Sequence, residues 1–363
     1  MKIAVLGCGG MGRSVLGHAR TSPHVQTLIG YDANPAAVER ARQQVPGVEA
    51  AADLDALLAD PQVRVVFVTA SNDAHKPLAL AALRAGKAVL CEKPIANTLA
   101  DAEMMVDEAE RLGAFFQIGF ELRYSQLYLQ VKNWIDQGLL GDIVTAQCTY
   151  ICSEFHHKNS WRNDPATGGS MFAEKLCHYV DLPRWWIGSP ATEVYAACAP
   201  NVVPYFKVHD NYFATCKYAC GAVSQLNFVM YLAQTFDGDP LQDVVAQQRG
   251  DGHELRCLIT GTRGGAATDV FNRSLKRWEF GDSPACMTSK LVEERTWAPE
   301  EDHHYFHDGR SQTLDVLRRV AEGLPPYTPA RDALETMRLV DAADESAEAG
   351  RPVQLQPAPP MTV

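Results

Sequence analysis

A glycine-rich turn between a short apolar strand and a helix constrains the fold of this chain more than any other feature. Residues 2–6 form the apolar run, the turn Gly7-Cys8-Gly9-Gly10-Met11-Gly12 follows, and a helical pattern continues to residue 20. In Gly-x-Gly-x-x-Gly the first glycine makes a tight turn, the second lets a pyrophosphate approach the backbone, and the third lets the helix pack on the strand. The turn therefore predicts a dinucleotide site at the N-terminus of that helix.

A carboxylate follows at the spacing that such a site requires. The second apolar run, residues 27–31, ends in Asp32. There it can accept hydrogen bonds from the adenosine ribose and repel a 2′-phosphate, so Asp32 predicts NAD as the cofactor in preference to NADP. The alternative is that Asp32 caps the helix that begins near Pro35, and both roles can hold at once.

The order of the patterns predicts two domains. Up to residue 121 strand-length and helix-length patterns alternate, which predicts an α/β Rossmann domain with a doubly wound parallel sheet over residues 1–121. Residues 122–363 contain strand-like runs with few helices between them, which predicts an α+β domain with a mainly antiparallel open sheet. A helical pattern at 331–349 is expected to pack back. The strand-like runs are 143–151, 193–199, 212–218, 222–230 and 254–260.

Charge and cysteine usage exclude several classes of function. The net charge is −11, so nucleic acid is not an expected partner. No apolar run reaches the length of about 18 residues that spans a bilayer, and we expect neither membrane insertion nor export. The ten cysteines contain no Cys-x-x-Cys, and histidines 303, 304 and 307 form no compact ligand set. These features favour a cytoplasmic protein without a metal.

A charged pair lies where a buried strand stops. Residues 88–91 read as a short strand, and Glu92-Lys93 precede Pro94, which ends it. The carboxyl ends of parallel strands border the ligand crevice, so Lys93 can meet a cofactor and a substrate there. The alternative is a surface salt pair on a turn.

A second pair of ionisable groups lies in the later half of the chain. If a helix starts at Ser170, Glu174 and His178 lie one turn apart on the same face, where the carboxylate can orient the imidazole for acid–base work. The alternative is a surface pair on a helix. Cys177 lies off that face and is expected in the core rather than as a nucleophile.

These motifs together resemble the Gfo/Idh/MocA family, which includes glucose-fructose oxidoreductase and inositol dehydrogenase. The resemblance covers nearly the whole chain. It depends on the glycine turn, on Asn72 and His75, on Gly86 to Pro94, on Trp161-Arg162, and on Gly168-Gly169 leading to His178.

The resemblance implies roles for individual residues. Lys93 lies beside the nicotinamide and the reacting hydroxyl, and His178 is its acid–base partner. The family's usual aspartate is Glu174 here, followed by an unusual Lys175. The residues implied at the cofactor are Gly7, Cys8, Gly9, Gly10, Met11, Gly12, Asp32, Thr69, Ser71, Asn72, His75, Glu92, Lys93, Trp161 and Arg162. The residues implied at the substrate are Lys93, Arg123, His156, Lys175 and His178.

The expected reaction is reversible hydride transfer between NAD and a secondary alcohol of a sugar, a sugar derivative or a cyclitol. One alternative is redox-neutral sugar chemistry in which the hydride returns within the turnover, and another is a non-catalytic sensor. An acidic sugar is a candidate because basic side chains gather near the expected pocket, although Lys175 facing solvent and pairing with a neighbouring acid remains the alternative. These residues are Lys175 and, on the adjoining loop, His156, His157, Lys158 and Arg162. A sheet with an uncovered face predicts a homodimer or homotetramer.

Overall fold

The computed structural model describes residues 1–153, 158–234, 250–298 and 305–355. The chain divides into two compact units, which we describe separately. The first unit contains Met1–Tyr124, Ala166–Gly169 and Asp308–Met337, and the second contains Ser125–Pro165, Ser170–His307 and Arg338–Val363. The predicted boundary after residue 121 lies close to the first division, but two later segments also belong to the first unit.

The first unit is built on a six-stranded sheet in which every neighbouring pair is parallel. The doubly wound parallel sheet predicted from the sequence is therefore confirmed. The strand order reverses between β1 and β4, and such a reversal opens the ligand crevice of this fold. In sheet order the strands are β3 (Val48–Ala50), β2 (Thr27–Tyr31), β1 (Lys2–Leu6), β4 (Val63–Val68), β5 (Ala88–Glu92) and β6 (Phe116–Gly119).

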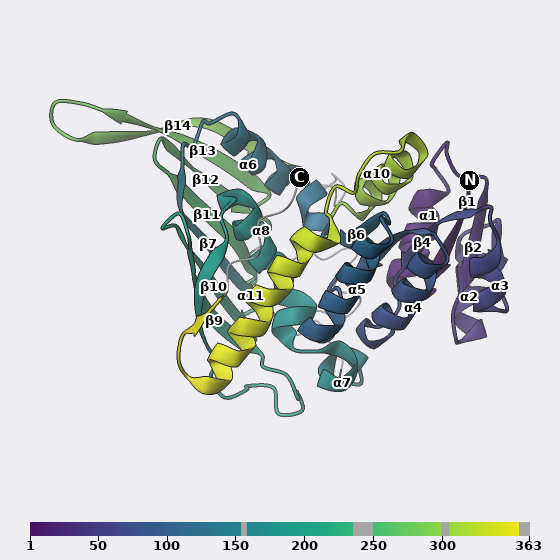
Figure 1. Ribbon diagram of the computed structural model, residues 1–363. Helices are drawn as coiled ribbons and strands as arrows, with labels where there is room; N and C mark the ends of the chain where they lie inside the picture. The colour runs from purple at the N-terminus through teal and green to yellow at the C-terminus, as the bar shows by residue number, and fades with distance from the viewer. Residues whose placement is uncertain (154–157, 235–249, 299–304, 356–363) are drawn as a thin grey trace. The chain divides into compact units, whose positions relative to one another are not determined.

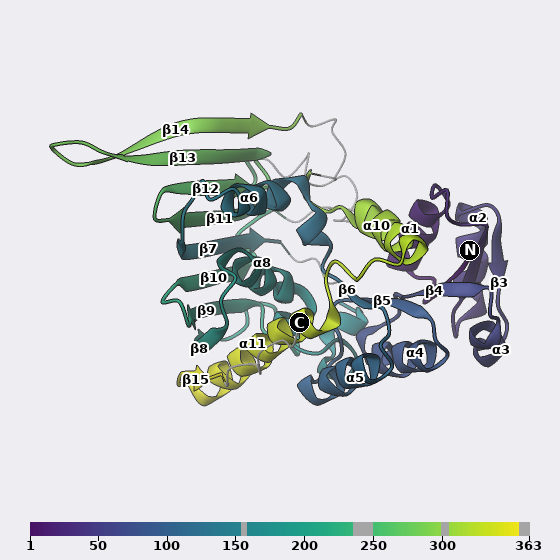
Figure 2. The same ribbon diagram turned by 45° about the horizontal axis from the view of Figure 1, so that its top comes forward.

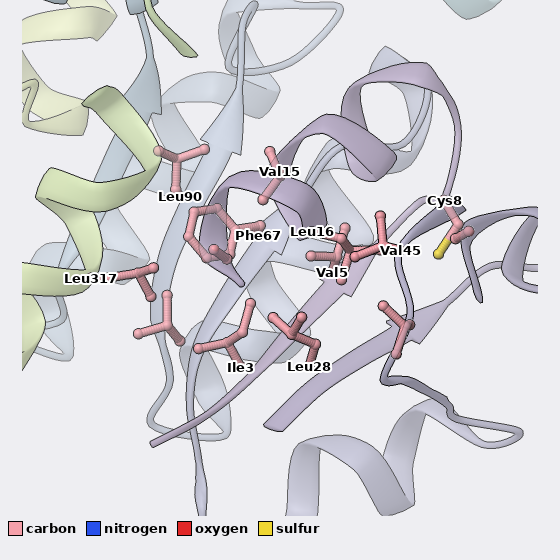
Figure 3. Packing of buried hydrophobic residues seen from close by; sticks show 14 of the residues in the cluster. Ile3, Val5, Cys8, Val15, Leu16, Leu28, Val45, Phe67, Leu90 and Leu317 are labelled. Carbon is pink, nitrogen blue, oxygen red and sulfur yellow. The ribbon is translucent and has the colours of Figure 1, made fainter. Parts of the chain in front are cut away.

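Helices cover both faces of this sheet (Figures 1 and 2). On one face, a cluster of buried side chains from α1, α2 and α10 packs on the strands, and Ile3, Phe67 and Leu90 lie within it (Figure 3). Burying each such side chain contributes about 1.5–3 kcal/mol. The helices of this unit are α1 (Gly10–Ala19), α2 (Pro35–Gln44), α3 (Leu54–Ala59), α4 (Asn72–Arg84), α5 (Leu99–Arg111), α7 (Pro165–Gly168), which lies almost wholly within it, and α10 (Gly309–Glu322), with a 3₁₀ turn, η1 (Glu121–Tyr124), after β6.

The second unit contains a nine-stranded sheet. All neighbouring strands are antiparallel except β7 and β10, which confirms the mainly antiparallel sheet predicted from the sequence. The sequence did not predict β12, β13 and β14. In sheet order the strands are β14 (Met287–Thr296), β13 (Ser274–Asp282), β12 (Gly264–Asp269), β11 (Glu254–Gly261), β7 (Ile143–Cys152), β10 (Val223–Met230), β9 (Asn211–Tyr218), β8 (Ala191–Ala197) and β15 (Val353–Gln354).

The two faces of the second sheet differ. Helices α6 (Gln126–Asp136) and α8 (Cys177–Ile187), and the later part of α11 (Ala330–Ala349), lie on one face (Figures 1 and 2). The C-terminal helix predicted at 331–349 is α11, and Ser346 Oγ on it accepts a hydrogen bond from Ala196 N of β8 at 2.9 Å. On the opposite face, no helix of the described residues covers the strands, and the large apolar side chains of Tyr195, Phe213 and Leu258 are exposed.

The outer edge of this sheet is poorly suited to pairing with another strand. Every residue of β14 is exposed, and the register with β13 shifts between Arg277 and Trp278, a bulge in the ladder. Bulges and charged side chains on an edge strand oppose further pairing.

No helix among the described residues is long and apolar enough to cross a membrane.

Candidate active site

The glycine turn has the geometry that its sequence predicts. Gly7 follows β1 with φ +100°, and a Cβ atom there would lie 2.5 Å from the backbone N of Ala70. A Cβ on Gly12 would lie 1.9 Å from the carbonyl oxygen of Gly7, so helix α1 packs on the turn only because Gly12 has no side chain. Gly9 and Gly10 have nothing within 4 Å of the Cβ position. The turn is closed on the protein side and open where a pyrophosphate would bind.

Asp32 lies at the end of β2 beside this turn. Its Oδ2 accepts a hydrogen bond from Cys8 N and its Oδ1 accepts one from Asn34 N, both at 2.8 Å. The N-cap of α2 is Asn34, whose side chain accepts from Ala36 N. Asn34 therefore caps α2, which was the alternative role considered for Asp32. Asp32 is instead bonded to the glycine turn through Cys8 N.

The end of β4 joins the same turn. Thr69 Oγ1 donates to the carbonyl oxygen of Gly7 at 2.7 Å, and Ser71 precedes helix α4 as its N-cap residue. Asn72 and His75, on the first turn of α4, are almost completely buried, with 4% and 1% of their surface exposed. Their side chains bond to the protein backbone: Asn72 Nδ2 donates to Gly168 O, and the His75 ring contacts Pro94 O and Ala70 O.

The charged pair after β5 has two different environments. Glu92 is buried, with 7% of its surface exposed, and its carboxylate packs against Gly119 of β6, where a Cβ would lie 2.8 Å from Oε2. Burial, followed by the nearby Glu121 carboxylate, raises the pKa of Glu92 to about 8, although Lys93 opposes the shift. Glu92 is therefore mainly protonated at neutral pH. Lys93 is half-buried at the carboxyl end of the strand, and its peptide bond to Pro94 is cis.

In the second unit, Glu174 lies in a π-helical turn, η3 (Phe172–Leu176), that runs into α8. Its Oε1 accepts a hydrogen bond from Nε of Arg162 at 2.9 Å. The Arg162 guanidinium carbon also lies 4.7 Å from the centroid of the Trp161 ring, within the 3₁₀ turn η2 (Trp161–Asn163). Sequence reasoning assigned Arg162 to the cofactor and missed this ion pair, because the two residues lie twelve positions apart with no shared periodicity.

His178 and its neighbours on α8 are deeply buried. His178 has 2% of its surface exposed and Cys177 has none. Lys175 is half-buried, and its Nζ lies 6.0 Å from the centroid of the Tyr150 ring on β7. Single π-helical turns inside α-helices are frequent at functional sites.

Three side chains that the sequence analysis did not assign to the site hold the start of this helix. Ser170 Oγ accepts from Ala173 N at 3.0 Å and donates to Asp344 on α11. Tyr212 OH on β9 donates to the other oxygen of Asp344 at 2.6 Å, and the Tyr212 ring stacks on Phe172. Asp344 thus ties the first turn of the helical segment that carries Glu174 and His178 to β9 of the sheet.

The remaining predicted residues differ in placement. Arg123 has 4% of its side chain exposed and forms an ion pair with Asp332 at 2.7 Å within the first unit. Its role at the substrate stays a prediction. Met11 is exposed on the glycine turn, and His156 lies outside the described residues.

Comparison with known proteins assigns the family. Residues 1–120 match the family described as an oxidoreductase family with an NAD-binding Rossmann fold. Residues 128–267 match the GFO/IDH/MocA C-terminal domain. The chain belongs to the Gfo/Idh/MocA oxidoreductase family.

Relatives within the Gfo/Idh/MocA family include enzymes with named activities. Inositol 2-dehydrogenase of Salmonella typhimurium is 33% identical over 301 residues, which cover 82% of this chain and 79% of that protein. 1,5-Anhydro-D-fructose reductase of Ensifer adhaerens is 29% identical over 185 residues, covering 50% and 56%. A structure of levoglucosan dehydrogenase with NADH and L-sorbose aligns with a TM-score of 0.79 over 98% of this chain and 99% of that one, at 20% identity, which supports the shared fold.

The first unit of this Gfo/Idh/MocA protein fits a nicotinamide dinucleotide. The space above Gly9 and Gly10, the N-terminus of α1 and the Asp32 carboxylate are the features that would hold the pyrophosphate and the adenosine ribose. Within the described ranges, no group of three or more histidine, cysteine, aspartate or glutamate side chains is arranged to hold a metal ion.

Proposed function

We propose that this protein is an NAD-dependent dehydrogenase that acts on a secondary alcohol of a cyclitol or a sugar. The observation that supports this most is Lys93 at the carboxyl end of β5, in the same parallel sheet in which the glycine turn follows β1 and Asp32 follows β2. The substrate class is proposed because relatives of the chain include inositol 2-dehydrogenase and 1,5-anhydro-D-fructose reductase.

In the proposed reaction the substrate carbon loses a hydride while its hydroxyl loses a proton. Bound NAD⁺ would supply the hydride acceptor, so that an alcohol and NAD⁺ would give a ketone, NADH and a proton. Lys93 takes the position beside the hydroxyl, and His178 accepts or returns the proton. Glu174, held by Arg162, orients the imidazole.

We propose a preference for NAD over NADP because two backbone hydrogen bonds fix the Asp32 carboxylate, one from Cys8 N of the glycine turn and one from Asn34 N. A 2′-phosphate would lie against a carboxylate that cannot easily move away. Titration of both cofactors into the apo protein tests this, and Asp32→Ala should narrow the difference. Equal affinities in the unaltered protein would overturn the preference.

One assay can test both which class of substrate is used and whether NADH accumulates as product forms. Purified protein is incubated with NAD and a panel that contains inositols, neutral sugars and uronates, and both NADH absorbance and product identity are followed. We expect NADH and ketone in equal amounts. Product without net NADH, formed only when NAD is present, would instead assign the redox-neutral alternative. Absence of any product would favour the sensor.

We also propose a homodimer or homotetramer assembled through the open face of the second sheet. Tyr195, Phe213 and Leu258 expose 44%, 42% and 42% of their surfaces there. Burial of such side chains against a second copy would offset their contact with water. Light scattering at micromolar concentration should detect the oligomer, and Phe213→Lys should weaken it.

The ten cysteines form no disulfide bonds, which favours the cytoplasmic setting that we propose.

A further inference from the structure

Two asparagines of the first unit hold a short piece of chain that comes from the middle of the sequence. Asn72 Nδ2 donates to Gly168 O at 2.8 Å. Asn97 Nδ2 donates to Thr167 O at 3.2 Å and to Ala166 O at 3.3 Å. These carbonyls belong to α7, a single helical turn whose last C=O groups have no partner within the helix. The two amides satisfy them.

The segment held in this way leads into the acid–base helix. Residues Ala166–Gly169 belong to the first unit, whereas the residues on either side belong to the second. Gly169 has φ +76°, and Ser170 follows as the residue whose Oγ accepts from Ala173 N. The chain that carries Glu174 and His178 therefore starts directly after a segment fixed by Asn72 and Asn97.

His75 holds the other reacting group in a comparable way. Its Nδ1 lies 2.8 Å from Pro94 O and its Nε2 lies 3.2 Å from Ala70 O. Burial lowers the pKa of His75, so the neutral ring has one N–H, and the shorter distance assigns it to Nδ1. Pro94 directly follows Lys93. Through the bond to Pro94 O, the buried imidazole fixes the turn that carries Lys93 to helix α4.

We propose that Asn72, Asn97 and His75 are positioning residues for the two reacting groups and that their side chains do not contact the cofactor. The inference deepens the proposed function and depends on it for the identity of Lys93, Glu174 and His178. Asn72 and Asn97 hold the entry to the helix of Glu174 and His178, while His75 holds the turn of Lys93. Only Asn72 and His75 were selected from the sequence, and both were assigned to the cofactor.

The first test uses Asn72→Ala and Asn97→Ala, with Asp53→Ala as the matched control. This control also removes one side-chain hydrogen bond in the first unit, the bond that Asp53 Oδ1 accepts from Ala56 N at the start of α3. We expect each asparagine variant to lower kcat by about tenfold, because misplacing a reacting group slows the chemical step. The dissociation constant for NAD should stay within about twofold, as a positioning role requires. The control should change neither quantity.

Hydrogen exchange gives a second readout that does not need a substrate. In both asparagine variants, peptides covering residues 166–173 should exchange at least about fivefold faster, because a local hydrogen-bonded unit has lost its anchor. The Asp53→Ala control should leave these peptides unchanged. Unchanged exchange in both asparagine variants would overturn the inference even if the protein is a dehydrogenase.

The second test compares His75→Gln with His75→Leu. Glutamine keeps a donor for Pro94 O, whereas leucine has none, so Gln should retain kcat within about threefold and Leu should lose about tenfold or more. If the Leu variant does not fold, the Gln variant and its NAD affinity still decide the question.

A rise of tenfold or more in the NAD dissociation constant for Asn72→Ala or His75→Gln, with kcat unchanged at saturating NAD, would assign these side chains to the cofactor and overturn the inference. Failure of the proposed function itself would show differently, as absence of turnover in the unaltered protein.

Discussion

The two sheets of this molecule bury their side chains in different ways. Five of the six residues of β4 in the parallel sheet are buried, with helices on both faces. In β10 of the antiparallel sheet buried and more exposed residues alternate along the strand, and only one face carries helices. A parallel sheet of this kind needs helical crossovers, which cover it on both sides.

This difference separates the tasks of the two regions. A sheet covered on both faces can offer ligands only the ends of its strands, and the glycine turn, Asp32, Thr69 and Lys93 all lie at such ends. The sheet of the second unit offers a whole face, which carries exposed apolar side chains. Glu174 and His178, which we propose for acid–base work, lie on the helical segment η3–α8 instead of on a strand.

The largest effect expected from this comparison is on turnover. Lys93→Met in the first unit and His178→Ala in the second should each lower kcat by on the order of a hundredfold or more, the scale of a positioned acid–base group. Binding of NAD should persist in both. Glu174→Gln should cost less, because it acts through His178. Stopped-flow NADH measurements check the rates, and near-normal turnover in either of the first two variants would remove that residue from the mechanism.

The close packing at the strand ends of the parallel sheet predicts a contrast between two glycines of α1. Gly12→Ala forces a Cβ against Gly7 O and should cost about 2–3 kcal/mol of stability together with most of the NAD affinity. Gly17→Ala has open space at the same helix and should gain about 0.5–1 kcal/mol. Urea unfolding of both variants measures the difference. Similar stabilities would contradict the packing assigned to the turn.

Two buried carboxyls, one in each unit, predict different pH dependences of stability. Burial and Glu121 raise the pKa of Glu92 to about 8, and burial raises that of Asp344 to about 6. Because both folded-state pKa values exceed those of the unfolded chain, the stabilising contribution is full at low pH. It is lost as the pH rises through about 8 for Glu92 and about 6 for Asp344.

Urea unfolding between about pH 4 and pH 9 should therefore show stability falling in two stages. Glu92→Gln should remove most of the decline above about pH 6. Asp344→Asn should act mainly below that pH, because it mimics the protonated carboxyl. A single decline that neither substitution changes would rule out both assignments.

The smallest effect concerns Lys175. If the substrate is an acidic sugar, Lys175→Gln should raise its KM by about threefold and leave neutral analogues unchanged. The contact of Nζ with the Tyr150 ring gives this side chain a packing role as well, so we expect no larger change. An equal response from uronates and neutral sugars would end the case for an acidic substrate.

The sequence alone determined much of the first unit. The glycine turn, the alternating patterns and the strand ends are local signals. They predicted the parallel sheet and indicated the family. The N-cap of α5 is a local feature of the same kind, because Thr98 Oγ1 accepts a hydrogen bond from Asp101 N at 3.2 Å. Strands β12 and β14 were missed because β12 consists mainly of small residues and β14 is exposed along its whole length, so neither has the alternation that marks a half-buried strand.

Only the tertiary structure decided how the functional side chains are supported. Arg162 binds Glu174, Asp344 binds Ser170, and Asn72 and Asn97 bind the chain at 166–168, across separations that range from twelve to 174 positions. Such contacts leave no periodic pattern in the sequence, because nothing in the local chain fixes which distant carbonyl or carboxylate a polar side chain will meet. The sequence therefore identified groups suited to the chemistry, and the folded chain determined which residues hold them in place.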